Sequence, residues 1–360
     1  MAKFSEVLTI VNGRNQKQVV CDDGKYPIYG SGGIMGYAND YICKAETVVI
    51  GRKGSINKPI FVETPFWNVD TAFGLCANSE KLNPKYLYYF CEKFDFEKLN
   101  TTVTIPSLTK SNLLNVEIPL PNLEKQKQIV ELLDKVTSLI FLRKQQLAKL
   151  DELVKVRFVE MFGDPVSNPL HWKKVKLSEL ADIKIGPFGS LLHKEDYVTG
   201  GHPLVNPSHI INGRIIVDND LTLTEGKYFE LSAYHLKKND VVLGRRGEMG
   251  RCAVVDEEGL LCGTGSLLIR TNGTVTADYI QKIISFPTFR KTIEDMAVGQ
   301  TMPNLNVPIV SNFMIIVPPL SVQKDYYDFV ECVDQQKQTV QQSLEKLELM
   351  KKALMQEYFW

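Results

Sequence analysis

The sequence of this chain repeats itself, and this repeat constrains the fold more than any other feature. Residues 104–108 (TIPSL) return as residues 301–305 (TMPNL), and the same spacing still separates Phe162 from Phe359. A constant spacing through roughly sixty residues without a gap indicates a duplicated structural unit. A chain with two similar halves can contact another molecule at two places.

The duplication extends towards the N-terminus, but the spacing changes along the way. Residues 4–8 (FSEVL) match residues 177–181 (LSELA), and residues 51–54 (GRKG) match residues 244–247 (GRRG) at a larger spacing. Insertions that change such a spacing belong in surface loops. The part of each half that precedes the final segment, here called its head, therefore agrees with its counterpart at both ends and differs in the middle. This pattern indicates one shared frame whose loops carry different specificities.

Each half ends in a heptad pattern that predicts a long helix. No Pro or Gly interrupts residues 122–162 or 321–360, and Pro121 and Pro319 stand just before them. The predicted seam, which would pair the helices and contact partners, consists of Ile129, Leu133, Val136, Ile140, Leu147, Leu150, Val330, Val333, Val340, Leu344 and Leu347.

A helix of about 40 residues is roughly 60 Å long and would leave this seam in water unless a partner covered it. The twin helix is the natural partner, because the duplication makes the two seams alike. The residues do not decide between a parallel and an antiparallel pair. We expect an antiparallel coiled coil, which would relate the halves by a pseudo-two-fold axis. Two separate surface helices, each lying on its own head, are the alternative.

The heads combine strands with short helices. Short apolar runs bounded by Gly, Asn or Pro predict buried strands at residues 47–50, 241–243, 267–269 and 313–317. Asn83-Pro84 predicts a capped helix start, and Thr276 is the matching cap in the second half.

The predicted fold class is therefore α+β, with two tandem-repeated α/β recognition domains joined by two long helices. The predicted boundaries are residues 1–120 for the first domain, 121–165 for a central spacer helix, 166–318 for the second domain and 319–360 for a C-terminal spacer helix.

Composition excludes several classes of protein. The chain has 360 residues, is 44% hydrophobic and 23% charged, and has a formal net charge of zero, which counts against a strong nonspecific polyanion binder. No signal-like or membrane-spanning apolar run occurs. The seven cysteines include no C-x-x-C pair, so we expect reduced thiols in a cytoplasmic protein.

Motifs for catalysis are missing from the sequence. It has neither a G-x-x-x-x-G-K-[ST] phosphate loop nor a G-x-G-x-x-G motif after a strand, and no Asn/Asp-Pro-Pro-aromatic tetrapeptide of an amino-methyltransferase. The five histidines show no zinc spacing. We therefore predict no catalytic residue, no metal site and no cofactor in this chain.

Polar loops that carry cations are the candidate binding elements. Arg52-Lys53 and Arg245-Arg246 each follow a strand-like run within a glycine-flanked turn. Glycine lets a backbone come close to a partner, and paired cations suit phosphates or the acceptor edge of guanine. Solvated turns are the alternative. The full set of predicted DNA-binding residues is Ser31, Arg52, Lys53, Lys58, Thr104, Ser107, Lys110, Arg245, Arg246, Arg251, Gln300 and Asn304.

The polar members of this set have two interpretations. Ser31 lies in the glycine-rich stretch 29–33 (YGSGG), which can approach a groove or form a simple turn. The hydroxyls and amides near the repeated proline, such as Ser107 and Asn304, can read base edges or cap turns.

Several segments resemble the specificity subunits of type I restriction–modification systems. Residues 26–33 (YPIYGSGG), 50–55 (IGRKGS) and 65–71 (PFWNVDT) are similar to a target-recognition domain of that family, as is the entry of residues 118–126 (IPLPNLEKQ) into a long helix. In the second half, residues 172–177 (WKKVKL) and 262–266 (CGTGS) are similar to family segments. The resemblance covers nearly the whole chain.

The resemblance implies a non-catalytic subunit that binds double-stranded DNA. Each head would read one half of a split, asymmetric target, and the helices would set the spacer and dock two modification subunits. These would carry S-adenosylmethionine and methylate adenine, and restriction subunits using ATP and Mg²⁺ would join them. The first head begins almost directly at Phe4, so we expect the C-terminal Phe359-Trp360 to cover its edge.

Two other functions remain open from the residues. A coiled-coil scaffold with two protein-binding heads would bind no DNA selectively. An enzyme with an unrecognised site, such as a methyltransferase or a nuclease, would act on DNA without partner subunits.

Overall fold

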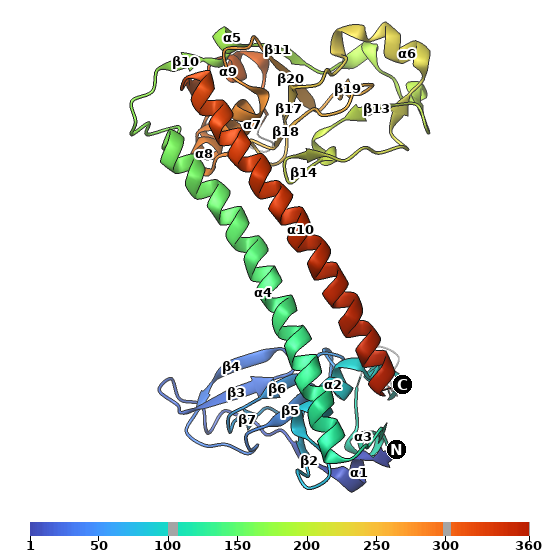
Figure 1. Ribbon diagram of the computed structural model, residues 1–360. Coiled ribbons are helices and arrows are strands. Elements are labelled where there is room, and N and C mark those ends of the chain that lie inside the picture. The colour runs from blue at the N-terminus through green and yellow to red at the C-terminus, as the bar shows by residue number, and fades with distance from the viewer. Residues whose placement is uncertain (100–106, 298–303, 360) are drawn as a thin grey trace. The chain divides into compact units, whose positions relative to one another are not determined.

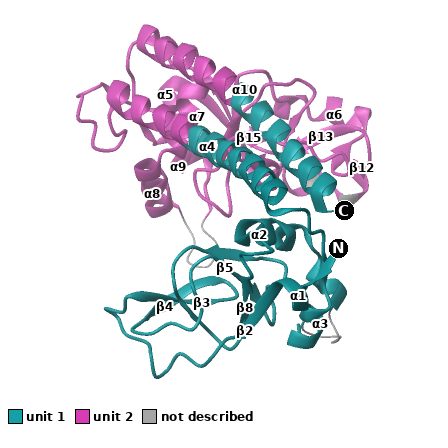
Figure 2. Cartoon of the chain, turned by 60° about the horizontal axis from the view of Figure 1, so that its bottom comes forward, with its two compact units in different colours: residues 1–148, 338–360 teal, residues 149–337 magenta. Residues whose placement is uncertain are grey.

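The computed structural model describes residues 1–99, 107–297 and 304–359 and divides into two compact units. The first unit comprises residues 1–148 and 338–360, and the second comprises residues 149–337 (Figure 2). Each unit therefore combines one head with part of each long helix. The first unit takes its final segment from the far end of the chain.

In the first unit, apolar runs form the strands that the sequence predicts. The main sheet is antiparallel with the order β2-β8-β5-β6 and consists of β2 (Leu8–Asn12), β5 (Thr47–Gly51), β6 (Ile60–Val62) and β8 (Ala72–Ala77). All five residues of β5 are buried. Beside it lies a smaller sheet of β3 (Tyr26–Gly30), β4 (Gly33–Ala38) and β7 (Trp67–Asn68), and a short pair of β1 (Ala2–Lys3) and β9 (Glu117–Ile118).

Short helices complete the first head. They are α1 (Phe4–Val7), α2 (Pro84–Lys93), the 3₁₀ turn η1 (Phe96–Leu99) and α3 (Lys110–Leu114). The predicted cap is confirmed, because the Asn83 side chain accepts hydrogen bonds from the backbone N–H groups of Lys85 and Tyr86. Helix α2 buries Leu87 and Phe90 in the core of this head.

The second head repeats this arrangement. Its main antiparallel sheet has the order β11-β20-β17-β18 and consists of β11 (Ala181–Ile185), β17 (Asp240–Gly244), β18 (Cys252–Val254) and β20 (Ser266–Thr271). A short pair joins β10 (Lys174–Lys176) to β21 (Met314–Ile316). The helices are α5 (Leu177–Leu180), α7 (Ala277–Ser285), α8 (Pro287–Met296) and α9 (Val307–Ser311), and Thr276 caps α7 as predicted.

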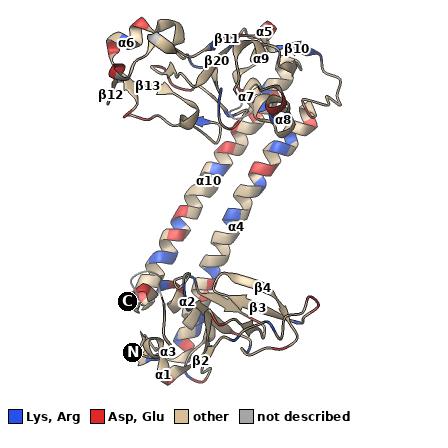
Figure 3. Ribbon diagram, turned by 180° about the vertical axis from the view of Figure 1, so that it is seen from behind, with Lys and Arg blue, Asp and Glu red and all other residues tan. Residues whose placement is uncertain are grey.

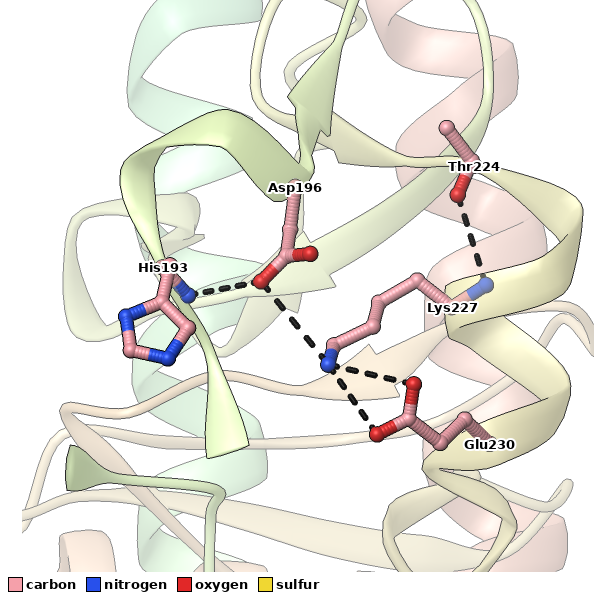
Figure 4. Close-up of polar contacts among 5 residues, drawn as sticks. All are labelled: His193, Asp196, Thr224, Lys227 and Glu230. Atoms are coloured by element: carbon pink, nitrogen blue, oxygen red, sulfur yellow. Dashed lines mark hydrogen bonds and ion pairs between the residues drawn. The ribbon is translucent and has the colours of Figure 1, made fainter. Parts of the chain in front are cut away.

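The middle of the second head is larger than its twin. It contains β12 (Tyr197–Val198), β13 (His202–Val205), β14 (Ile210–Ile211), β15 (Arg214–Ile215), β16 (Thr222–Leu223), β19 (Leu261–Cys262), α6 (Glu225–Glu230) and the 3₁₀ turns η2 (Gly189–Leu191), η3 (Lys194–Asp196), η4 (Pro207–His209) and η5 (Ser232–Tyr234). Lys227 on α6 connects two of these segments. Its ammonium lies 3.8 Å from the Asp196 carboxylate and 3.1 Å from that of Glu230 (Figure 4).

Equivalent hydrogen bonds confirm the duplication at atomic detail. The Tyr86 hydroxyl donates to the Pro119 carbonyl at 3.1 Å, and the Tyr279 hydroxyl donates to the Ile316 carbonyl at 3.0 Å. These partners occupy matching positions in the two halves. Both tyrosines are fully buried, and burial raises the pKa of Tyr86 to about 12.

The two predicted long helices are α4 (Leu123–Phe162) and α10 (Leu320–Phe359), which Figure 1 shows in green and red. Acidic and basic residues are interspersed along both helices (Figure 3). In the first unit, Ile129 and Leu133 near the start of α4 share a core with Met355 near the end of α10. Lys144 and Glu348 form an ion pair of 2.8 Å between the two helices.

In the second unit, the end of α4 meets the start of α10. The Tyr326 hydroxyl donates to the Val154 carbonyl at 3.3 Å, and the Phe158 ring lies 5.5 Å from the Tyr326 ring. Lys337 and Asp151 form an ion pair of 2.7 Å. The helices therefore run antiparallel within each unit, as expected from the duplication, and the alternative of two separate surface helices is wrong.

The C-terminal end of α10 closes the core of the first unit. Phe359 is 1% exposed, and its ring lies 5.0 Å from Tyr86 and 6.0 Å from Phe90. In the second unit, Phe162 at the end of α4 lies 5.1 Å from Tyr279 in the matching way. The expected role of Phe359 is confirmed, whereas Trp360 lies outside the described residues.

Candidate functional site

The first cation loop begins where strand β5 leaves the sheet. The Arg52 N–H donates to the Thr71 carbonyl at 2.8 Å, and the Arg52 carbonyl accepts from the Leu108 N–H at 2.9 Å. Gly51 is required at the end of the strand, because a Cβ there would lie 2.6 Å from the Ser55 carbonyl oxygen and 3.0 Å from the Ser31 Cβ. The glycine-rich turn that carries Ser31 therefore lies against this loop.

The second cation loop has the same backbone connections after strand β17. The Arg245 N–H donates to the Gly265 carbonyl at 2.9 Å, and the Arg245 carbonyl accepts from the Leu305 N–H at 2.9 Å. Arg245 and Leu305 match Arg52 and Leu108 in the duplicated pattern. Gly265 directly precedes β20 as Thr71 directly precedes β8, the strand that pairs with the cation-bearing strand in each head. Equivalent loops are therefore held by equivalent main-chain contacts in both units.

In each unit, the segment after the repeated proline is brought to the cation loop. Lys53 forms an isolated antiparallel bridge with Ser107, and Arg246 forms one with Asn304. Ser107 is half-buried, and the Asn304 Oδ1 atom is buried with no hydrogen-bond partner among the described residues. Two predicted polar positions, far from the cations in sequence, thus lie beside them in space.

The cations of these loops differ in their exposure to solvent. Arg52, Lys53 and Arg246 are exposed, and the Arg52 guanidinium lies 5.7 Å from the centre of the Phe73 ring. Exposed cations on a fixed backbone can neutralise phosphates without first breaking an ion pair.

Arg245 is more deeply placed than its neighbour. Its Nε donates to the Leu305 carbonyl at 3.1 Å and its Nη1 to the Thr264 carbonyl at 3.5 Å. Burial, followed by the repulsion of Arg246, lowers the pKa of its guanidinium. Arg245 therefore stabilises the loop that presents Arg246.

The remaining predicted residues lie around these loops or outside the described ranges. Lys58 is exposed between Gly54 and β6. Lys110 is the first residue of α3, and its ammonium donates to the Ile10 carbonyl at 2.9 Å. The Arg251 guanidinium donates to Glu248 through Nε and Nη2 and to the Pro207 carbonyl through Nη1, so part of its donor set is used within the unit. Thr104 and Gln300 lie outside the described residues.

The predicted helix seam is buried or half-buried along its length. Ile129, Leu133, Val136, Val333, Val340 and Leu344 are buried, and Ile140, Leu147, Leu150, Val330 and Leu347 are half-buried. Helix α4 also carries a second apolar surface that does not belong to the predicted seam. Leu139, Phe141 and Leu142 are 45%, 60% and 55% exposed. At roughly 100° per residue they lie about 100–160° round the helix from Ile140 of the seam, and only the structure shows that the twin helix leaves them uncovered.

No feature of a catalytic metal centre occurs in the described part of the chain. Within residues 1–99, 107–297 and 304–359, no three His, Cys, Asp or Glu side chains gather as a metal ion would require. In the same ranges, every helix is too short or too polar to cross a lipid bilayer.

Two mixed α/β units with equivalent cation loops and antiparallel connecting helices define a class of protein with two tandem recognition heads. The sequence matches the family described as type I restriction modification DNA specificity domain over residues 1–152 and 169–349. The chain belongs to this family of type I restriction–modification specificity subunits.

Known proteins agree with this assignment. The type I restriction enzyme MjaVIII specificity subunit of Methanocaldococcus jannaschii is 24% identical over 86% of this chain and 75% of its own length. The crystal structure of a type I restriction–modification S subunit from M. genitalium matches with a TM-score of 0.63 at 16% identity, over 100% of this chain and 95% of that one. A structure from a study of complex assembly in the type I system matches with a TM-score of 0.63 at 15% identity, over 99% and 96%. The predicted fold class is confirmed, and the scaffold alternative is not favoured.

Proposed function

We propose that this chain is the non-catalytic subunit that gives a cytoplasmic type I restriction–modification complex its DNA sequence specificity. Each head reads one half of a bipartite, asymmetric target on double-stranded DNA. The observation that carries this proposal is the repeated loop, in which an exposed cation and a polar side chain are held by the same main-chain contacts in both units.

The chemistry of the loops fits such a reader. Arg52, Lys53 and Arg246 can contact phosphates or the acceptor edge of guanine, while Ser107 and Asn304 offer hydroxyl and amide groups to base edges. Because the backbone frames agree and the side chains differ, the two heads would hold DNA alike and read different bases. This difference is what an asymmetric target requires.

The helices supply the other part of the proposal. They set the spacer between the half-sites and dock two modification subunits, which carry S-adenosylmethionine, and restriction subunits with ATP and Mg²⁺ join this assembly. The exposed Leu139, Phe141 and Leu142 on α4 support docking, because an apolar surface of this kind is typical of protein contacts. Replacing Phe141 and Leu142 with Ser should abolish co-purification of modification subunits while the circular dichroism of the chain stays unchanged. Replacing the exposed Ser138 with Ala is the control.

The loops are tested by DNA binding of the complex with its modification subunits at several salt concentrations. Arg52→Ala with Lys53→Ala should lower the affinity for the target and reduce the slope of log K against log salt by about 0.9 for each phosphate that is no longer neutralised. Arg246→Ala should do the same in the second head, with a slope change of about 0.9.

The matched controls are exposed lysines at the opposite ends of the same strands. Lys44 precedes β5 and Lys238 precedes β17, and both are exposed. Their replacement with Ala should leave affinity and salt slope unchanged. If the loop variants behave like these controls, the loops do not contact DNA.

A further inference from the structure

The second unit contains a cavity that is not lined by Arg245 or Arg246 of its cation loop. Its volume is about 470 Å³, and its lining residues come from the β14–β15 hairpin, the loop that leads into β18, and helices α7 and α8. Figure 1 labels β14, β18, α7 and α8 in the second head. The polar and charged side chains that line it are Asn212, Glu248, Arg251, Gln281, Lys282, Ser285 and Arg290. Sites for small molecules usually measure about 300–1,000 Å³, so this cavity is large enough for one.

The charges in the lining are unbalanced. Three cations face a single carboxylate, because Glu248 is the only acid among the lining residues. Its Oε2 atom accepts from the Arg251 Nη2 at 2.8 Å, and its Oε1 atom accepts from the Arg290 Nη1 at 2.7 Å. Hydrogen bonds from Arg251, followed by those from Arg290, keep the pKa of Glu248 low. The Glu248 carboxylate, which we call the internal anion, thus pairs with both arginines.

Two donors at this cavity lack a partner in the described part of the chain. The Arg290 Nε atom is buried and has no hydrogen-bond partner there. The half-buried Lys282 side chain forms no hydrogen bond or ion pair among the described residues. Burial lowers the pKa of its ammonium, and the nearby charges of Asp334 and Asp278 offset this only in part. A cation that is partly withdrawn from water without a hydrogen-bonded anion, as Lys282 is, carries a cost in free energy. The lining therefore favours an additional anion.

The cations are held in place by the backbone around them. Gly250 has a φ of +76°, and a Cβ there would lie 2.7 Å from the Arg290 Cγ, so only glycine lets this side chain pack here. At the rim, Asn212 and Gly213 both have positive φ angles of 51° and 76°, which form the tight turn of the β14–β15 hairpin. A preformed site of this kind needs little reorganisation to bind a ligand.

The first unit lacks the equivalent site. The positions that match Glu248, Arg251 and Arg290 at the spacing of the cation loops are Ser55, Lys58 and Glu97, and Tyr89 stands in place of Lys282. A single cation and an acid replace three cations and an acid. The cavity therefore belongs to one head only and is not part of the duplicated frame.

We propose that this cavity binds a phosphate group, with Arg251, Lys282 and Arg290 as its ligands and Glu248 as an internal anion that the phosphate displaces. Arginine forks match phosphate oxygens in paired hydrogen bonds, and a displaced carboxylate can turn to solvent because Glu248 is an exposed residue. The phosphate comes either from a small free ligand or from the DNA backbone, and the experiment separates the two. Phosphate binding by the free chain does not rest on the proposed function.

The test is a calorimetric titration of the full-length chain with inorganic phosphate at low ionic strength. Glu248→Gln keeps the side-chain shape and removes the competing charge, so it should tighten phosphate binding by about tenfold, the effect of one charged hydrogen-bond partner. Arg290→Gln and Lys282→Met should each weaken it by about tenfold or more for the same reason. Lys238→Gln is the matched control and should leave binding unchanged, because Lys238 is an exposed lysine of the second unit that does not line the cavity.

Thermal unfolding of each variant identifies any that fails to fold, and Lys282→Met then serves as the second test of the lining. The proposal is overturned if the wild-type and Glu248→Gln chains bind no phosphate, or if Lys238→Gln weakens binding as much as Arg290→Gln. DNA binding by the assembled complex then identifies the source. A salt slope reduced by about 0.9 in Arg290→Gln identifies a backbone phosphate, whereas an unchanged slope identifies a small free ligand.

Discussion

Replacing Phe359 with Ala should destabilise the first unit and leave the second intact. The Phe359 ring is 1% exposed and packs against Tyr86 and Phe90 at 5.0 and 6.0 Å. Removing a buried phenylalanine typically costs about 3–5 kcal/mol of unfolding free energy, since the favourable transfer energy disappears and a cavity remains. For a unit of this size, the melting temperature falls by about 2–4 °C per kcal/mol, so the first unit should melt roughly 6–20 °C lower.

Hydrogen exchange followed by mass spectrometry measures this effect unit by unit. In Phe359→Ala, the amides of β5 and β8 should exchange faster while those of β17 and β20 keep their protection. Phe162→Ala is the matched control, because Phe162 closes the second unit against Tyr279, and it should give the reverse pattern. If Phe359→Ala accelerates exchange equally in both units, or in neither, the C-terminal segment is not the missing part of the first core.

Two further predictions concern the helices and their starts. Inserting seven residues at matching places in α4 and α10 lengthens each helix by about 10 Å. The unspecified gap between the two half-sites of the DNA target should then grow by about three base pairs at 3.4 Å per step. Methylome sequencing reads this gap, and an unchanged gap refutes the spacer role. Gln126→Ala should lower the free energy of unfolding by about 2–4 kcal/mol, because the buried Gln126 side chain makes three hydrogen bonds, with Asn83, Lys81 and Pro121. Gln323→Ala should lower it less, because the Gln323 side chain makes two. Urea unfolding checks the order, and equal destabilisation contradicts it.

The local sequence patterns predict much of each head. Val48 to Ile50 is an apolar run inside β5 (Thr47–Gly51), and this strand is buried because such a run can hide both faces only inside a sheet core. Asn83 before Pro84 predicts the start of α2, since the amide side chain satisfies backbone N–H groups that a helix leaves free. These features depend on neighbours within a few residues, so the sequence contains them directly.

The candidate site could be predicted only in part. The glycine-flanked cations are visible in the sequence, but the different roles of Arg245 and Arg246 are not. Arg245 stabilises its loop through the Leu305 carbonyl, which is distant in sequence, while Arg246 remains exposed. The cavity lined by Lys282 and Arg290 left no sequence signal, because its walls come from separate elements that meet only in the folded unit.

The order of residues is enough to establish that this chain has two related heads, two long amphipathic helices and paired cation loops. Repetition, heptad spacing and turn residues are local properties that each stretch of chain carries alone. The antiparallel course of the helices and the contacts of Phe359 with Tyr86 and Phe90 are settled only by the folded chain. A heptad seam shows which side chains must be buried, and it fits a parallel or an antiparallel partner equally well. The choice depends on packing between residues far apart along the chain.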